Sequence, residues 1–125
     1  MKEPIRVTTS VYDFIKNQIH RKRVSPEEEE LLKEELKSAV QLPSREIPNE
    51  VVKVGSFVLV KDHTLGTEQE FQVVGMGKSK PSKGKYAMDS SIVMAVLGRN
   101  EGFVLEWPFK DGKREIEILR VINPR

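Results

Sequence analysis

Cysteine is absent from this sequence of 125 residues, which excludes disulfide bonds, thiol catalysis and thiolate metal ligands. Histidine is scarce, since only His20 and His63 occur, and their separation does not match the ligand spacing of a metal site. No apolar run approaches the roughly 20 residues of a membrane-spanning helix, and the amino terminus is too polar for a signal peptide. We therefore expect a cytoplasmic protein that has no cofactor, no bound metal and no membrane partner.

Neither sign of charge is in clear excess, because 21 Lys and Arg residues face 19 Asp and Glu residues and the formal net charge is +2. Dedicated nucleic-acid-binding domains usually carry a marked basic excess. Aromatic residues are few, at 6% of the chain, so a pocket built from clustered aromatic side chains is not indicated. The length fits one globular domain, or a domain with a small appendage.

The first forty residues predict two short helices. In the first, Ser10 is the expected N-cap and Asp13 stands three residues later, as in a capping box, and apolar residues follow at helical spacing. The second is expected to begin at Ser25, with Pro26 in the first helical position and Glu28 as the capping-box partner. The longer helix is expected to have about 16 residues and a length of roughly 24 Å. Their short connection favours an antiparallel hairpin.

After a proline-containing linker, the sequence changes to short segments rich in Val, Ile and Phe that alternate with turn signals, which predicts about five strands. Asp111-Gly112 is a strong hairpin signal, and residues 90–98 predict one short helix. The fold class is therefore α+β, with an antiparallel sheet packed on one short helix. We expect two parts, residues 1–47 with the helical hairpin and linker, and residues 48–125 with the sheet.

Three segments together resemble one known family: VVKVGSFVLVKDHTLGTEQEFQVVG at residues 51–75, GKYAMDSSIVMAVLG at residues 84–98 and DGKREIEILRVI at residues 111–122. Their order and spacing are similar to those of the C-terminal domain of the Gre family of bacterial transcription elongation factors. The resemblance implies an FKBP-like fold, in which a curved antiparallel sheet embraces a short helix. It also implies binding to RNA polymerase near the entrance of the secondary channel.

The helical part departs from this family. Gre factors carry a long coiled coil whose acidic tip helps to hold a catalytic metal ion in the polymerase, so that water cleaves a backtracked transcript. The shorter stalk expected here is similar to that of the Rnk-type relatives, the regulators of nucleoside diphosphate kinase. This resemblance implies a monomeric transcription regulator that is not an enzyme and does not stimulate cleavage. The alternative is a Gre-type cleavage factor that uses Glu27 and Glu28 at the hairpin tip.

Two groups of residues are candidates for contact with the polymerase. The first aligns with the family's Ser-Pro-Ile region and consists of Ser90, Ser91 and Ile92, for which packing in the protein core is the alternative. The second lies at the hairpin tip and consists of Ser25, Glu27 and Glu28. Carboxylates in a first helical turn also stabilise the helix through its dipole, by about 0.3–1 kcal/mol each, so a purely structural role is the alternative there.

A third candidate is a loop with four lysines and no acidic residue, Lys78, Lys80, Lys83 and Lys85. Such a loop can contact nucleic acid or an acidic polymerase surface without reading sequence, or it can be a solvated loop. It contains no aromatic residue that would stack on a base. A basic-loop nucleic-acid-binding module is therefore a further alternative function. A prolyl isomerase is another, but fold alone does not establish that activity.

Overall fold

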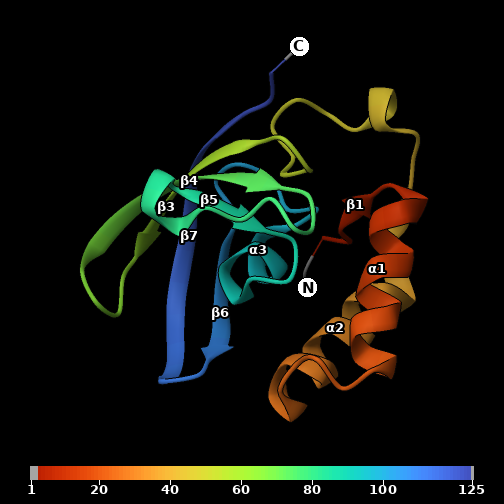
Figure 1. The fold of residues 1–125 in the computed structure, drawn as a ribbon, viewed down its shortest axis with the longest axis horizontal. Coiled ribbons are helices and arrows are strands. Elements are labelled where there is room, and N and C mark those ends of the chain that lie inside the picture. The colour runs from red at the N-terminus through yellow and green to blue at the C-terminus, as the bar shows by residue number, and fades with distance from the viewer. Residues whose placement is uncertain (1–2, 125) are drawn as a thin grey trace. The chain divides into compact units, whose positions relative to one another are not determined.

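The computed structural model describes residues 3–124, which divide into two compact units on either side of the Pro48–Asn49 junction. The amino-terminal unit contains the helices α1 and α2, and the carboxy-terminal unit contains a five-stranded sheet and the helix α3 (Figure 1). Among the described residues, no helix combines the length and the apolar character needed to cross a membrane.

The amino-terminal unit is a helical hairpin closed at its base by a small β-ladder. Helix α1 covers Thr9–His20 and helix α2 covers Pro26–Ser38, so the longer helix has 13 residues and not 16. Strand β1, Arg6–Val7, precedes the hairpin and pairs in parallel with β2, Val40–Gln41, which follows it. The sequence did not predict this ladder, because two residues are too few to show an alternating pattern. The buried apolar residues of the unit are Ile5, Val7, Val11, Ile15, Ile19, Leu32 and Ile47.

The N-cap of α1 is Thr8, so the prediction of Ser10 is wrong. The Thr8 hydroxyl accepts a hydrogen bond from the Val11 backbone N–H at 3.2 Å, and Thr8 has the extended backbone of a cap residue. Ser10 lies within the first turn and is exposed. Both residues have the side chain that caps require. Cap preference alone therefore did not distinguish the two residues. In the structure, the helix starts directly after strand β1, which ends at the buried residue Val7.

Replacement of Thr8 by alanine is expected to lower the free energy of unfolding by about 1 kcal/mol, since one amide of the first turn loses its acceptor. The matched control is Ser10→Ala, which is expected to be neutral or slightly stabilising because alanine has the higher helix propensity. Urea denaturation followed by circular dichroism measures both changes. A larger loss for Ser10→Ala than for Thr8→Ala would contradict the assignment.

The carboxy-terminal unit is built on a sheet with the strand order β5-β4-β3-β7-β6. Its strands are β3, Phe57–Asp62; β4, Thr67–Val74; β5, Lys85–Ala87; β6, Val104–Phe109; and β7, Gly112–Ile122. Neighbouring strands are antiparallel except β4 and β5, which are parallel. The predicted sheet of about five strands is confirmed, but it is mixed and not wholly antiparallel. The segment between β4 and β5 returns the chain to the end of the sheet from which β4 started, so β5 runs in the same direction as β4.

Helix α3, Ser91–Val96, lies within the curl of this sheet (Figure 1). Its last residues are buried, and so are the inward-facing residues of the strands, including Val58, Phe71, Trp107 and Ile118. Gly98 follows the helix with a φ of +79°, a left-handed conformation that glycine adopts without strain and that commonly ends a helix. The predicted short helix and its glycine terminator are therefore present.

Candidate functional site

The beginning of α3 is held half-buried at the surface of the carboxy-terminal unit. Ser90, Ser91 and Ile92 are each of intermediate exposure, whereas every residue from Val93 to Gly98 is buried. The indole N–H of Trp107 donates a hydrogen bond to the Ser91 hydroxyl at 3.1 Å. Strand β6 therefore fixes the first turn of the helix. The three candidate residues lie next to one another with part of each side chain accessible to a partner.

A small polar cavity of about 70 Å³ lies beside Ile92. Two of its lining residues form an ion pair, with an Arg114 nitrogen 3.2 Å from a carboxylate oxygen of Asp62. The other Asp62 oxygen accepts the Leu65 backbone N–H at 2.9 Å. The Arg114 guanidinium also lies over the ring of Phe109, 4.1 Å from its centroid. This ion pair was not predicted, because its members come from strands β3 and β7, which are distant in the sequence.

The turn that forms the hairpin tip is closed by backbone hydrogen bonds. The Lys22 N–H bonds to the Ile19 carbonyl at 3.1 Å, and the Arg23 N–H bonds to the Gln18 carbonyl at 2.9 Å. This is the pattern of a Schellman motif, with Lys22 in the left-handed position at φ +55°. The chain therefore leaves α1 abruptly and reaches the N-cap of α2 within a few residues.

The predicted capping box of α2 is present. The Glu28 N–H bonds to the Ser25 hydroxyl at 3.1 Å, and the Ser25 N–H bonds to a Glu28 carboxylate oxygen at 3.0 Å. Two of the three candidate tip residues are thus occupied in starting the helix. The third, Glu27, is exposed, and its side chain makes no hydrogen bond or ion pair within the part of the chain that the structure describes.

Glu29 is held by two lysines, Lys33 at 2.9 Å and Lys22 at 3.1 Å. The side-chain hydrogen bond from Lys33, and then that from Lys22, lowers the pKa of Glu29. The folded state therefore favours the ionised form of Glu29. The contribution of this carboxylate to stability is present above the ordinary carboxyl pKa and is lost as the pH falls through the lowered pKa. The pair of Glu29 with Lys33 joins two positions four residues apart on α2. Within residues 3–124, no three His, Asp or Glu side chains come together to hold a metal ion.

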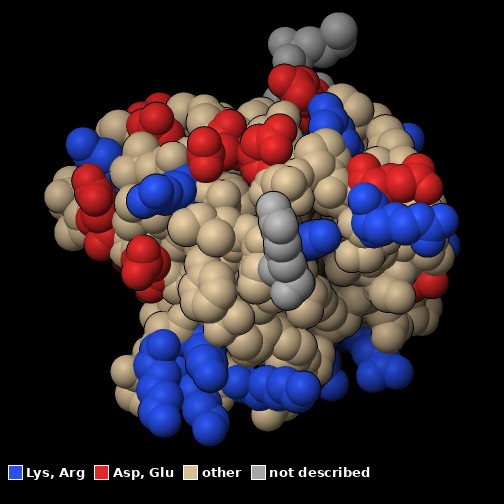
Figure 2. Space-filling view, turned by 90° about the horizontal axis from the view of Figure 1, so that it is seen from above, with Lys and Arg blue, Asp and Glu red and all other residues tan. Residues whose placement is uncertain are grey.

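The lysine loop between β4 and β5 includes one short 3₁₀ helix, η2, Pro81–Lys83. Lys78, Lys80 and Lys83 are exposed, and Lys85 is half-buried at the start of β5. Figure 2 shows a group of basic side chains at the lower left, without an acidic side chain among them. The loop belongs to the same unit as α3, whereas the hairpin tip belongs to the other unit.

Two solved structures have a fold similar to that of this chain. The prokaryotic transcription elongation factor GreA/GreB from Nitrosomonas europaea matches with a TM-score of 0.69 at 23% identity, over 97% of this chain and 99% of that one. Gfh1 of Thermus aquaticus matches with a TM-score of 0.53 at 20% identity, over 98% of this chain and all of that one. These similarities define the class by fold: an α+β sheet domain that follows a helical hairpin.

The family is shown by sequence. The family model described as "Transcription elongation factor, GreA/GreB, C-term" matches residues 47–123, so the chain belongs to the GreA/GreB family. It is 37% identical over 86 residues to transcription elongation factor GreA of Clostridium beijerinckii, covering 69% of this chain and 54% of the relative. For GreA of Clostridium botulinum (strain Eklund 17B), the identity is 37% over 90 residues, covering 72% and 56%. The matched regions thus span about half the length of these relatives.

The expectation that the chain is not an enzyme is contradicted by these relatives. They are named transcription elongation factor GreA, and the family match lies in the same class. As stated in the sequence analysis, Gre factors assist the polymerase in hydrolysing a backtracked transcript. A short stalk is therefore not a sufficient reason to separate this chain from the Gre family. The Rnk-type relationship stays a prediction.

Proposed function

We propose that the protein is a Gre-type transcription elongation factor that binds RNA polymerase through the start of α3. The observation that carries this proposal is the half-exposed turn formed by Ser90, Ser91 and Ile92. It lies within the region that matches the family, and the hydrogen bond from Trp107 fixes its orientation. A preorganised surface of this kind loses little conformational freedom on binding. A factor with this partner would act in the cytoplasm, where the polymerase is, and we expect it to act as a monomer.

Substitution of Ile92 by aspartate is expected to weaken binding to core RNA polymerase at least about tenfold, because a charge replaces an apolar contact. The matched control is Ile122→Asp, the same substitution at a side chain that is 50% exposed at the end of β7. Binding is measured by anisotropy of labelled protein, and melting temperatures check folding. Should Ile92→Asp prove unstable, Ser90→Asp tests the same turn. Equal affinity of Ser90→Asp, Ile122→Asp and the parent chain would refute the docking site.

We further propose that the hairpin lies at the entrance of the secondary channel when α3 is docked. Helix α2 has 13 residues, which corresponds to about 20 Å at 1.5 Å per residue. A stalk of this length suits the outer part of a channel. Competition with a full-length Gre factor for the polymerase tests this placement, and simultaneous binding of both factors would contradict it.

A second candidate activity is stimulation of transcript cleavage, and the exposure of Glu27 favours it. This carboxylate stands at the hairpin tip without a partner in the described chain, so it is free to approach a metal ion held by the polymerase. Carboxylates are suitable ligands for Mg²⁺, which usually takes only one or two of them and keeps several waters. Glu28 already accepts the Ser25 N–H through one carboxylate oxygen, which holds this side chain against the helix start.

The cleavage candidate predicts that the parent chain shortens the transcript in a backtracked elongation complex and that Glu27→Gln reduces this rate by about tenfold or more. Glutamine preserves size and removes only the charge. Glu30→Gln, an equally exposed position one turn further along α2, is the control and should keep the parent rate. No shortening by the parent chain, together with normal polymerase binding, would exclude this activity without affecting the docking proposal.

The lysine loop is proposed to add an electrostatic contact with nucleic acid or with an acidic surface of the polymerase. Its support is the exposure of Lys78, Lys80 and Lys83 in a segment without acidic residues. Contacts of this kind weaken steeply as salt is raised. Exchange of the three lysines for glutamine should therefore flatten the salt dependence of polymerase binding, and an unchanged dependence would remove the loop from the interface.

A further inference from the structure

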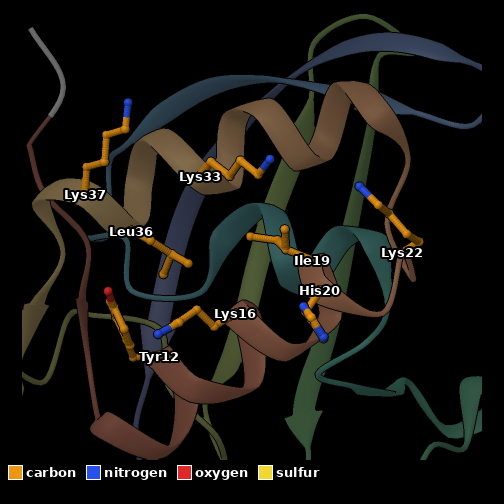
Figure 3. Close-up of a pocket in the computed structure, with 8 residues that line it drawn as sticks. All are labelled: Tyr12, Lys16, Ile19, His20, Lys22, Lys33, Leu36 and Lys37. Carbon is orange, nitrogen blue, oxygen red and sulfur yellow. The ribbon is translucent and has the colours of Figure 1, made fainter.

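The amino-terminal unit contains a groove of about 750 Å³ between α1 and α2 (Figure 3). Its lining residues belong to α1, α2 and the turn between them, and the carboxylates of Glu27, Glu28 and Glu29 are not among them. Its lining consists of three residues with apolar surface and five basic residues: Tyr12, Ile19, Leu36, Lys16, His20, Lys22, Lys33 and Lys37. No acidic side chain is among them. The groove therefore combines an apolar floor with a rim of positive charge.

The floor repeats at helical spacing. Tyr12 and Ile19 are seven residues apart on α1, and Leu36 faces them from α2. Ile19 is buried, whereas Tyr12 and Leu36 are only half-buried. In Figure 3 the side chains of Ile19 and Leu36 are directed between the two helices. Two packed helices leave a groove of this kind open along their length, and a third amphipathic helix is the element that fills it.

The positive charge of the rim is least compensated at the end away from the hairpin tip. Near the tip, Lys22 and Lys33 share the carboxylate of Glu29. Further along, Lys37 makes only an exposed contact with Glu34 at 3.3 Å, a type of pair that contributes little. The side chain of Lys16 makes no hydrogen bond or ion pair within residues 3–124. An acidic partner would therefore gain most from Lys16 and Lys37, which lie on opposite helices.

We propose that this groove binds an acidic amphipathic helix of a partner protein. Its apolar stripe would cover Tyr12, Ile19 and Leu36, and carboxylates on its two flanks would face the lysines of α1 and α2. This is the helix-in-groove mode of recognition, in which the apolar face contributes affinity. The flanking charges correspond to those that fix partner choice and orientation in coiled coils. The chemistry of the partner thus follows from charge complementarity and from the apolar floor together.

Single-stranded nucleic acid fits the groove less well. Proteins that bind it combine basic grooves with several aromatic side chains on which successive bases stack. Here Tyr12 is the only aromatic residue in the lining. The lysines also stand on both sides of an apolar strip, and do not form one continuous basic track that would follow a phosphate backbone.

The test uses the whole chain and a labelled synthetic peptide of about 20 residues that has leucine at helical-stripe spacing and glutamate on both flanks. We expect saturable binding, detected by fluorescence anisotropy, with a dissociation constant in the micromolar range. Replacing Lys16 and Lys37 by glutamate is expected to weaken binding at least about tenfold, because two contacts become repulsive. If that variant is less stable, Lys16→Gln with Lys37→Gln removes the charges without reversing them.

The matched control reverses Lys110 and Lys113, two exposed lysines of the other unit, and should leave peptide affinity within about twofold of the parent value. A peptide of the same composition with a scrambled stripe should not bind. Equal binding of the scrambled peptide would mean that charge alone is recognised, and would overturn the proposal. So would absence of binding at low salt, or an RNA oligonucleotide that binds more tightly than the peptide and is equally sensitive to Lys16 and Lys37.

Discussion

Replacement of Trp107 by alanine is expected to lower the free energy of unfolding of the carboxy-terminal unit by about 3–5 kcal/mol. Trp107 is 1% exposed and faces the interior from β6, where the sheet encloses α3. Alanine would leave a cavity that the surrounding strands cannot fill, and Ser91 would lose the indole N–H donor. Because domains of this size are stable by only about 5–15 kcal/mol, this change would bring the unit close to unfolding. Urea denaturation followed by circular dichroism measures the loss.

The comparison that separates packing from hydrogen bonding is Trp107→Phe. Phenylalanine keeps an aromatic ring in the site but has no N–H for the Ser91 hydroxyl. We expect a loss of about 1–2 kcal/mol from the hydrogen bond and the smaller ring. If phenylalanine and alanine were equally destabilising, the hydrogen bond and not the packing would dominate. If neither changed stability, Trp107 would not be part of the core.

The second large effect is expected for Asp62→Ala, which should lower the free energy of unfolding by about 2–3 kcal/mol. Arg114 would then lack its closest carboxylate, 3.2 Å away, and the Leu65 N–H would lose its acceptor. The expected loss is below that of a fully buried ion pair because the two side chains remain 10% and 23% exposed. Thermal and urea denaturation of the purified chain measure it.

Two variants make the Asp62 result specific. Asp62→Asn keeps an oxygen for the Leu65 N–H and removes the charge, so we expect about half of the loss. Asp111→Ala removes the other carboxylate near Arg114, which is 3.7 Å away and 68% exposed, and should change stability by less than about 0.5 kcal/mol. A loss for Asp111→Ala equal to that for Asp62→Ala would show that burial does not govern this pair.

The sequence predicted most of the elements because local chemistry determines them. Ser25, Pro26 and Glu28 specify the start of α2 within four residues, and the structure forms that capping box. The alternating strands and the Asp111-Gly112 hairpin signal are likewise local, and β6 and β7 pair across a turn at Lys110 and Asp111, with Gly112 as the first residue of β7. Local signals failed where two solutions were equally good, as for Thr8 and Ser10, and where a strand was too short to show a pattern, as for β1 and β2.

Features that join distant parts of the chain were beyond the reach of the sequence. The pairing of β5 with β4 is parallel because of the path taken by the connecting loop, and no residue pattern states that direction. The ion pair of Asp62 with Arg114 joins residues 52 positions apart, and the Trp107–Ser91 hydrogen bond joins β6 to α3. These contacts depend on strand order, which arises only when the sheet assembles.

For the candidate sites, the sequence by itself determined which residue types are present for a contact with a partner: the Ser-Ser-Ile turn, the acidic helix start and the lysine loop, whose roles stay predictions. Only the tertiary structure decided how much of each remains available. It binds Glu28 and Glu29 within the hairpin and leaves Glu27 exposed. It also forms the lysine-rimmed groove, because α1 and α2 bring together side chains that are separated along the chain. The physical reason is that residue type sets the possible interactions, whereas burial and partners set which ones are still free.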